Sequence, residues 1–334
     1  MRLEQRIELF SALGKRMTSI SENEFDEIAV RAHGENNWFT EKSIKTAFEG
    51  ILKLLDKEAL TKWASKYALE PSNAKLVGVV MAGSIPLVGF HDLLSVVISG
   101  HRLAIKPSSN DTVLLKWVVN ELIQLEPNIG ELVRFEDRLN DVDAIIATGS
   151  DNTARYFEYY FSKKPHIIRK NRTSCAVLKG GESPSQVMGL GQDIFTYFGL
   201  GCRNVSKLFV PRDFNFQQLL DGLHEFENVM DHHKYKNNYD YNKSIYLVNN
   251  EPHLDTGFLL LRESEALVSP ISVLFYEYYN SESHLEEMLE VNSEKIQCVV
   301  GSGNSFETLG QAQFPAVTDY ADGIDTLKFL SALN

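Results

Sequence analysis

The 334-residue chain is predicted to be an α/β protein with a Rossmann-like parallel sheet, a second α/β domain and a helical N-terminal segment. Past Pro71, short apolar runs alternate with amphipathic segments, which is typical of βαβ units. Before Pro71, apolar residues recur at helical spacing instead. With 43% hydrophobic residues, the chain is long enough to form two domains of ordinary size.

Residues 1–70 form the predicted helical segment. The stretch 37–41 interrupts it, and Thr40 is the predicted N-cap of the helix that follows. No residue pattern in this segment indicates chemistry. The apolar positions at helical spacing are Leu3, Ile7, Phe10 and Leu13, followed by Ile44, Phe48, Ile51, Leu52 and Leu55.

Residues 71–165 are predicted to form a Rossmann-like cofactor-binding domain. Ligands of such sheets bind at the carboxyl ends of the strands, so the loops that follow the strands are the candidate sites. These loops contain Ser84, then Lys106 with Ser108 and Ser109, then Gly149 and Ser150. We expect strands over 76–81, 102–106, 131–135 and 144–147, and helices over 88–99, 112–124 and 152–161.

Each of these loops taken singly is also compatible with an ordinary turn between a strand and a capped helix. No G-x-G-x-x-G occurs in this region, which argues against an ordinary dinucleotide fingerprint. A backbone N–H cluster at the helix after Gly149 could still hold a phosphate group.

Residues 166–305 are predicted to form the second α/β domain, and 306–334 a turn-rich tail that ends in a short helix. The stretch 231–242 is expected to be an exposed loop, and its adjacent His232 and His233 lack the spacing of a metal pair. We expect strands over 166–168, 175–178, 208–210, 244–248, 257–261, 273–278 and 296–300, and helices over 187–198 and 217–229.

Cys202 is the candidate nucleophile. It lies between glycines and an arginine, in Gly199-Leu-Gly-Cys-Arg203, so a ligand can approach closely and a positive charge is adjacent in the sequence. The alternative is that Cys202 is a small buried apolar residue, as many cysteines are. The odd count of three cysteines suggests neither a disulfide framework nor a zinc ribbon, and fits a reducing cytoplasm; Cys298 is expected to be structural.

The net charge of −12 argues against nucleic acid as a main partner. The densest basic run, 162–172, could meet a phosphorylated cofactor or be a solvated face. The N-terminus has no signal-peptide pattern, and no segment has the roughly twenty apolar residues of a membrane span, so we expect a cytoplasmic protein.

The order of these parts resembles the aldehyde dehydrogenase superfamily over residues 75–325. Within it, Gly199-Leu-Gly-Cys-Arg-Asn-Val-Ser206 and Lys106-Pro-Ser-Ser-Asn110 look most like the LuxC-like acyl-CoA reductase family. The resemblance implies an aldehyde-dehydrogenase-like fold, in which a Rossmann-type domain binds the cofactor and a second α/β domain supplies the cysteine.

The resemblance also implies roles for single residues. Cys202 would accept the acyl group, and Ser84 falls where the superfamily has an asparagine that helps hold the oxyanion. Lys106 would reach the adenine ribose, and Gly149 and Ser150 the pyrophosphate. Glu265 approximates a glutamate that touches the nicotinamide ribose, although its spacing to Pro270 is off by one.

Two departures from the superfamily pattern refine the expected function. Ser109 stands where many NAD-preferring relatives have an acidic residue, which favours NADPH over NADH. The stretch 167–174 contains no carboxylate where hydrolytic members have a water-activating glutamate, so a Cys202 thioester would be reduced rather than hydrolysed.

We therefore expect NADPH-dependent reduction of an acyl-CoA, of the fatty acyl class, to the aldehyde through a Cys202 acyl-enzyme. The alternatives are aldehyde oxidation or acyl-phosphate reduction by the same cysteine, or a non-catalytic binding protein of the same fold. No metal is expected. A protein that transfers or activates the acyl group, and a homo-oligomer, remain open as partners.

Overall fold

The computed structural model describes residues 1–149, 151–303 and 305–333. The chain divides into two compact units, which are described separately. Unit 1 comprises residues 1–171 and 315–334, and unit 2 comprises residues 172–314. This division differs from the boundaries expected at 165 and 305, because β5 (His166–Arg169) pairs with the first sheet and the C-terminal tail returns to unit 1.

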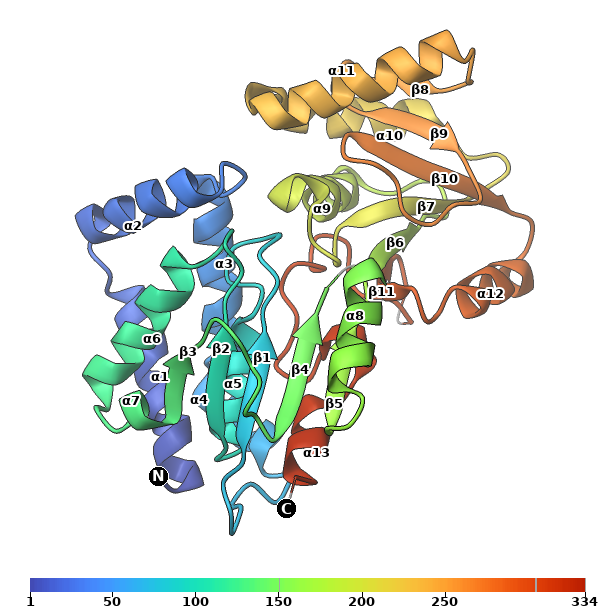
Figure 1. Ribbon diagram of the computed structural model, residues 1–334. Helices are drawn as coiled ribbons and strands as arrows, with labels where there is room; N and C mark the ends of the chain where they lie inside the picture. The colour runs from blue at the N-terminus through green and yellow to red at the C-terminus, as the bar shows by residue number, and fades with distance from the viewer. Residues whose placement is uncertain (150, 304, 334) are drawn as a thin grey trace. The chain divides into compact units, whose positions relative to one another are not determined.

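The sheet of unit 1 has five parallel strands in the order β3-β2-β1-β4-β5. The order reverses between β1 and β4, which is the topological switch point where doubly wound sheets bind ligands. All four strands expected between 76 and 147 are present (Figure 1). The strands are β1 (Leu76–Val80), β2 (Arg102–Lys106), β3 (Val133–Phe135), β4 (Ala144–Thr148) and β5.

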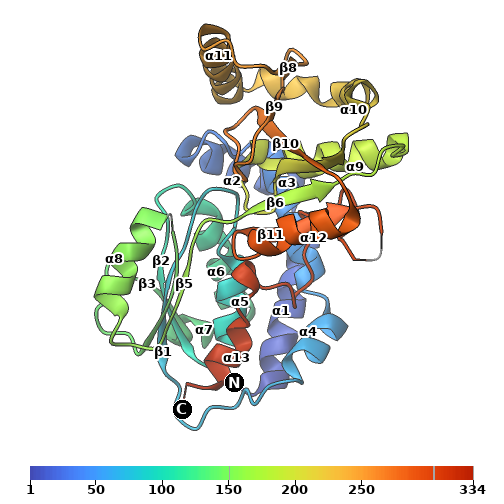
Figure 2. The same cartoon turned by 90° about the vertical axis from the view of Figure 1, so that its right-hand side faces the viewer.

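Helices cover both faces of this sheet. Figure 2 shows α8 (Asp151–Phe161) on one face and α5 (Phe90–Ile98) with α6 (Val113–Leu125) on the other. This arrangement follows from right-handed crossovers on the two sides of the switch point. The short helices α7 (Ile129–Leu132) and α13 (Thr326–Ser331) complete the unit, with α13 packed on α5.

The N-terminal helices pack on α5 and α6 and share one hydrophobic core with them. The predicted helical segment is therefore part of unit 1. Thr40 is the N-cap predicted for α3, because its side chain accepts a hydrogen bond from the Ser43 N–H. The four helices are α1 (Leu3–Thr18), α2 (Glu22–Glu35), α3 (Glu41–Leu54) and α4 (Lys57–Ala64).

Unit 2 contains a six-stranded sheet in the order β11-β6-β7-β10-β9-β8, parallel except for the antiparallel β8. Its strands are β6 (Thr173–Val177), β7 (Val205–Pro211), β8 (Leu254–Asp255), β9 (Leu260–Glu263), β10 (Val273–Tyr279) and β11 (Ile296–Gly301). Its helices are α9 (Pro184–Phe195), η1 (Thr196–Gly199), α10 (Phe216–Leu223), η2 (His224–Asp231), α11 (His233–Val248) and α12 (Glu282–Val291), and η3 (Ala321–Gly323) lies in unit 1.

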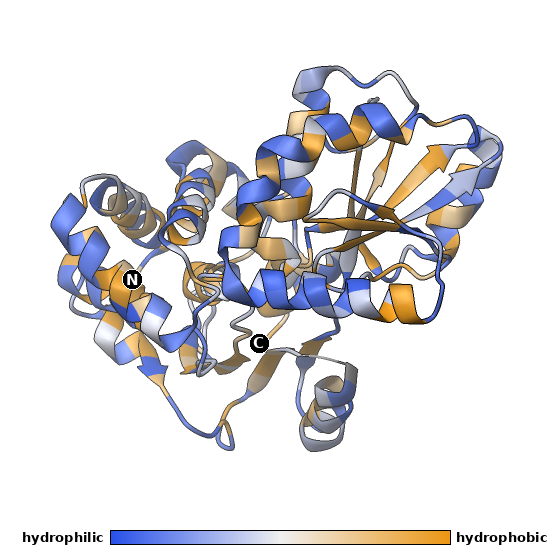
Figure 3. Cartoon of the chain, turned by 90° about the horizontal axis from the view of Figure 1, so that it is seen from above, coloured by the Kyte–Doolittle hydropathy of each residue, from blue (hydrophilic) through white to orange (hydrophobic). Residues whose placement is uncertain are grey.

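The stretch 231–248 differs from the prediction of an exposed loop followed by a strand. Asp231 ends η2, and α11 follows from His233 with His232 as its N-cap. The buried face consists of three tyrosines and one asparagine, so the pattern lacks the aliphatic residues that signal a helix, and Figure 3 shows most of this helix as hydrophilic. The buried residues are Tyr235, Tyr239, Asn242 and Tyr246. The strand expected at 257–261 is β9, which begins three residues later.

Among the described residues, none of the helices is both long and apolar enough to cross a bilayer. Over the same residues, His, Cys, Asp and Glu side chains do not gather in a group that could hold a metal ion.

Candidate functional site

Two loops meet at the carboxyl edge of the unit 1 sheet. The loop after β1 runs to α5, and the loop after β2 runs to α6. Gly83 in the first loop lies against Ser108 in the second, so closely that a Cβ on Gly83 would lie 2.5 Å from the Ser108 Oγ. Only glycine allows the two loops to come this close without a shift of Ser108 and its neighbours. Ser84 follows on the same loop and is exposed.

Asp111 fastens these two loops together. Its Oδ2 accepts a hydrogen bond of 2.6 Å from the Leu87 N–H, and Leu87 has a left-handed φ of 56°. The other oxygen, Oδ1, is buried and has no hydrogen-bond partner among the described residues. Burial raises the pKa of the Asp111 carboxyl to about 7. Sequence reasoning missed this residue, because its partner is a backbone group 24 positions away.

Lys106 ends β2 and is exposed, with its Nζ donating to the Asp137 carbonyl at 3.3 Å. Ser108 is half-buried, and its Oγ accepts from the Asn110 N–H. Ser109 is exposed. The structure therefore brings the sequence-predicted residues Lys106, Ser108 and Ser109 to the same edge as Ser84.

Gly149 lies directly after β4, on the other side of the switch point. Its N–H donates to the Arg169 carbonyl at 3.3 Å. A Cβ on Gly149 would lie 3.0 Å from the Thr153 side chain in the first turn of α8, so glycine permits a tight passage from strand to helix. Ser150, the neighbouring candidate, lies outside the described residues.

The carboxyl edge of unit 1 is the edge at which doubly wound sheets bind their ligands. Gly83 and Gly149 both follow strands at the switch point, and each lies too close to a neighbouring side chain to carry a Cβ without a shift. Lys106 supplies a cation on the same edge. The assignment of these residues to parts of a cofactor remains a prediction.

Cys202 lies in unit 2, in the turn between η1 and β7, and its side chain is exposed. The two other cysteines, Cys175 and Cys298, are buried. Burial raises the pKa of the Cys298 thiol to about 12, and it raises the pKa of Cys175 as well. Cys202 is therefore the cysteine that a substrate can reach, and the alternative of a buried Cys202 is wrong.

The backbone that leads into Cys202 is strained. Tyr197 and Phe198 have left-handed φ values of 55° and 57°, followed by Gly199 at 80°. A left-handed conformation costs a non-glycine residue about 1 kcal/mol or more, so the surroundings must hold it in place. The Phe198 ring contacts the His232 ring, with the ring centroids 4.4 Å apart.

Arg203 and Asp193 connect the Cys202 turn to the segment 307–312. The Arg203 Nη1 lies 3.2 Å from a Glu307 carboxylate oxygen and 3.2 Å from the Ala312 carbonyl. Asp193 is fully buried, and its two oxygens accept hydrogen bonds from the Gly310 and Ala312 N–H groups at 2.6 and 3.0 Å. The Arg203 charge that the sequence places next to the thiol is thus paired with Glu307.

Glu265 is exposed in the loop that follows β9. Lys207 stabilises this loop, because its buried ammonium donates hydrogen bonds to the carbonyls of Ser264 and Ala266. The ammonium also pairs with the Glu277 carboxylate at 2.6 Å. Burial is the strongest influence on the Lys207 pKa and lowers it.

The end of β5 carries Arg169, within the stretch 167–174 that contains no carboxylate. Its guanidinium is buried and makes two hydrogen bonds to Asp92, at 2.6 and 2.8 Å, and a third to Thr326. Asp92 on α5 is therefore paired with a cation. In unit 2, Asp193 accepts two backbone hydrogen bonds and Glu307 pairs with Arg203.

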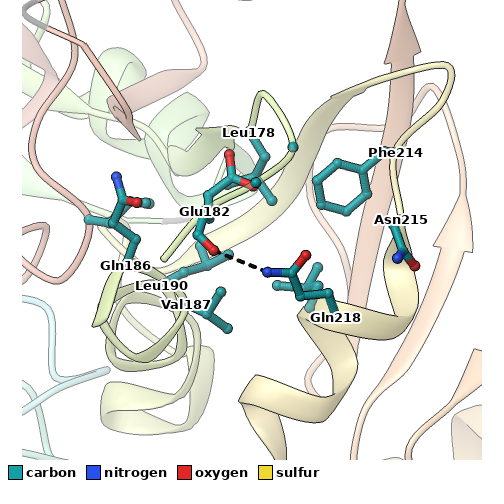
Figure 4. A pocket seen from close by; sticks show the side chains of 12 residues that line it. Leu178, Glu182, Gln186, Val187, Leu190, Phe214, Asn215 and Gln218 are labelled. Carbon is teal, nitrogen blue, oxygen red and sulfur yellow. Dashed lines mark hydrogen bonds between the residues drawn. The ribbon is translucent and has the colours of Figure 1, made fainter. Parts of the chain in front are cut away.

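A small pocket lies at the carboxyl ends of β6 and β7 in unit 2 (Figure 4). Leu178, Val187, Leu190 and Phe214 form its apolar part, and the Gln218 side chain donates to the Glu182 carbonyl at its rim. Its volume is about 30 Å³, which is room for a water molecule or two and too little for an acyl chain.

The fold matches solved structures of aldehyde dehydrogenases. An NAD-dependent aldehyde dehydrogenase from Sinorhizobium meliloti has a TM-score of 0.69 and 12% identity, over 93% of this chain and 72% of that one. A putative aldehyde dehydrogenase from Burkholderia cenocepacia has a TM-score of 0.66 and 14% identity, over 93% and 76%. The NAD+ complex of an aldehyde dehydrogenase from Bacillus cereus has a TM-score of 0.63 and 14% identity, over 91% and 73%.

No family model matches the sequence, and no curated protein matches it. At 12–14% identity, the structural likeness establishes the fold alone. The predicted aldehyde-dehydrogenase-like fold is confirmed, whereas the finer resemblance to acyl-CoA reductases remains a proposal.

Proposed function

We propose that the protein is a nicotinamide-dependent oxidoreductase that works through a covalent intermediate on Cys202, and that its reaction is the reduction of an acyl-CoA to the aldehyde. The observation that carries this proposal is the exposed cysteine on a strained, fixed turn, in a fold shared with aldehyde dehydrogenases. The other two cysteines are buried and have raised pKa values, so they are unsuited to attack a substrate.

In the proposed reaction, the Cys202 thiolate attacks the thioester carbonyl carbon. The carbon–sulfur bond to CoA breaks, and CoA leaves as a thiolate that takes up a proton. The proposed donors to the oxyanion are the Cys202 backbone N–H and the Ser84 hydroxyl. The nicotinamide cofactor, when bound, supplies the hydride that turns the acyl-enzyme into a thiohemiacetal. Cleavage of the bond between Cys202 and the thiohemiacetal carbon then releases the aldehyde and restores the cysteine.

Reduction is favoured over hydrolysis because the stretch 167–174, which the resemblance aligns with the water-activating glutamate of hydrolytic enzymes, contains no carboxylate. Asp92 is paired with Arg169, and Asp193 and Glu307 bind groups of unit 2. The acyl-enzyme on Cys202 would therefore persist until it is reduced.

NADPH is the proposed cofactor. Lys106 and Ser109 are both exposed at the edge where the adenine ribose would lie, and Ser109 provides a hydroxyl in place of a carboxylate. A 2′-phosphate would be repelled by a carboxylate and accepted beside a lysine. Titration with NADPH and NADH, each followed by cofactor fluorescence, tests this preference, and tighter binding of NADH would contradict it.

The second candidate is an NAD-dependent aldehyde dehydrogenase that uses the same cysteine. It is favoured by the fold comparisons, since one matching structure is described as NAD-dependent and another as an NAD+ complex. Acyl-phosphate reduction and a non-catalytic binding role are weaker alternatives. An acyl-donating partner protein and a homo-oligomer are compatible with the proposal.

The deciding experiment measures cofactor turnover with three donor pairs: acyl-CoA with NADPH, acyl phosphate with NADPH, and aldehyde with NAD+ or NADP+. Wild type is compared with Cys202→Ala and with Cys298→Ala, a buried cysteine that serves as the control. We expect aldehyde formation from acyl-CoA, lost in Cys202→Ala and retained in Cys298→Ala. Turnover only with aldehyde would favour the second candidate, and no turnover with any pair would favour the binding role.

A further inference from the structure

Asn204 lies two residues after Cys202 and is almost fully buried. Its amide nitrogen lies 2.7 to 3.3 Å from the carbonyl oxygens of Asp193, Ile194 and Thr196, at the end of α9. Helix ends leave carbonyl groups without intrahelical partners, and this side chain satisfies several of them.

The other side of the same amide faces the turn. The Asn204 Oδ1 accepts a hydrogen bond of 2.8 Å from the Gly201 N–H, and the Asn204 N–H donates to the Gly201 carbonyl at 3.0 Å. Both polar atoms of the side chain are thus in use. The amide nitrogen binds carbonyls at the end of α9, and the amide oxygen binds Gly201, the residue directly before Cys202.

A closed ring of contacts passes through this side chain. Arg203 donates to the Ala312 carbonyl, the Ala312 N–H donates to Asp193, and the Asp193 carbonyl accepts from Asn204, which follows Arg203 in the chain. The ring fixes both flanks of Cys202 against α9 and the segment 310–312. Such a ring can hold the left-handed Tyr197 and Phe198 that precede the turn.

We infer that Asn204 is a positioning residue that holds Cys202 in the geometry for attack on the substrate carbonyl. The inference deepens the proposed function and rests on it. Asn204 acts through the turn and need not touch the substrate. Because displacement of a reacting atom by about 1 Å can cost about a hundredfold in rate, loss of the Asn204 contacts should lower kcat strongly.

The test compares Asn204→Ala with Asn242→Ala. Asn242 on α11 is also a buried asparagine of unit 2, and its amide binds the carbonyls of Asn238 and Ile271, which lie outside the Cys202 turn. We expect Asn204→Ala to lower kcat about tenfold to a hundredfold with the KM for NADPH unchanged. Asn242→Ala should lose thermal stability and keep its kcat within about twofold.

Hydrogen exchange of the peptide 196–204 gives a readout that does not depend on activity. In Asn204→Ala this peptide should exchange faster than in wild type and in Asn242→Ala, because the Gly201 N–H has lost its acceptor. If Asn204→Ala does not fold, Asn204→Ser takes its place, because its hydroxyl can donate to one carbonyl but is too short to bridge α9 and Gly201, and a loss of kcat is again expected.

Unchanged exchange in the peptide 196–204 of Asn204→Ala would overturn the inference, as would an equal loss of kcat in Asn242→Ala. If wild type reduces no acyl-CoA, the proposed function has failed. The exchange result then still decides whether Asn204 holds the turn.

Discussion

The loop after β1 in unit 1 is held by a carboxyl group, whereas the Cys202 turn in unit 2 is held by a carboxamide. Asp111 uses one oxygen to bind the left-handed Leu87 and leaves the other buried without a partner among the described residues. Asn204 uses both of its polar atoms. A carboxamide does not titrate, so the hydrogen bonds of Asn204 are independent of pH. The hydrogen bond of Asp111 changes when its carboxyl group ionises.

The two loops should therefore differ in how strongly their conformation depends on pH. The turn that carries the candidate nucleophile is fixed by a neutral group at every pH at which the protein is folded. The loop that carries Ser84 is held by a group whose pKa lies near 7. Variants of the two loops should therefore differ in how their effects depend on pH.

The largest effect is expected from Gly83→Ala. The new Cβ would lie 2.5 Å from the Ser108 Oγ and 3.1 Å from the Asn110 Cβ, so the two loops must move apart. We expect NADPH to bind about tenfold or more weakly, measured by cofactor fluorescence, because a displacement of about 1 Å removes contacts that need close approach. Gly130→Ala, where nothing lies within 4 Å, is the control and should bind as wild type does. Equal binding by both variants would show that the loop contact does not matter.

The next effect is a change in pH dependence in Asp111→Asn. Burial raises the pKa of Asp111 from 3.8 to about 7, so ionisation of the carboxyl opposes folding. The stability that the neutral carboxyl contributes is complete below pH 3.8 and is lost as the pH rises through about 7. Since one pKa unit corresponds to about 1.4 kcal/mol, Asp111→Asn should gain about 1–3 kcal/mol over wild type between about pH 5 and pH 8.

Urea unfolding at several pH values measures this gain. Asp193→Asn is the counterpart in unit 2, because burial also raises the pKa of Asp193 to about 7. Both variants should flatten the pH profile, but Asp193→Asn should be less stable than wild type at low pH, because its amide can accept only one of the two backbone hydrogen bonds that Asp193 accepts. Profiles parallel to that of wild type would mean that neither carboxyl titrates in this range.

The smallest effect is expected from Arg203→Gln. The Arg203–Glu307 pair is partly exposed, and such ion pairs contribute about 1 kcal/mol or less. The variant should retain the Asn204 contacts and lower kcat only about twofold to fivefold, as measured with the same donors as Asn204→Ala. A loss as large as that of Asn204→Ala would move the positioning role from the carboxamide to the guanidinium.

Much of unit 1 could be predicted from the sequence. Its strands are short apolar runs with polar loops at their ends, and Thr40 caps α3 in the manner that its sequence position suggests. Cys202 could also be singled out as the candidate nucleophile, because glycines precede it and an arginine follows it. These features depend on neighbours in the chain, which a single sequence displays.

The rest could not be predicted, because it depends on partners far apart in the chain. Asp193 binds Gly310, 117 residues away, and Arg169 pairs with Asp92, 77 residues away. The sequence does not reveal the helix α11, because tyrosines form most of its buried face. It does not reveal the boundary after Asn171 either, because β5 joins a sheet formed by earlier strands. Tertiary contacts decide these features, and local periodicity does not record them.

The most direct test of the central claim is the mass of the Cys202 peptide after wild-type protein is mixed with an acyl-CoA in the absence of cofactor. The account predicts a single acyl adduct on the peptide that contains Cys202, with release of an equal amount of CoA, and no adduct on that peptide in Cys202→Ala. No adduct on Cys202, or an equal adduct on Cys175 or Cys298, would contradict the account.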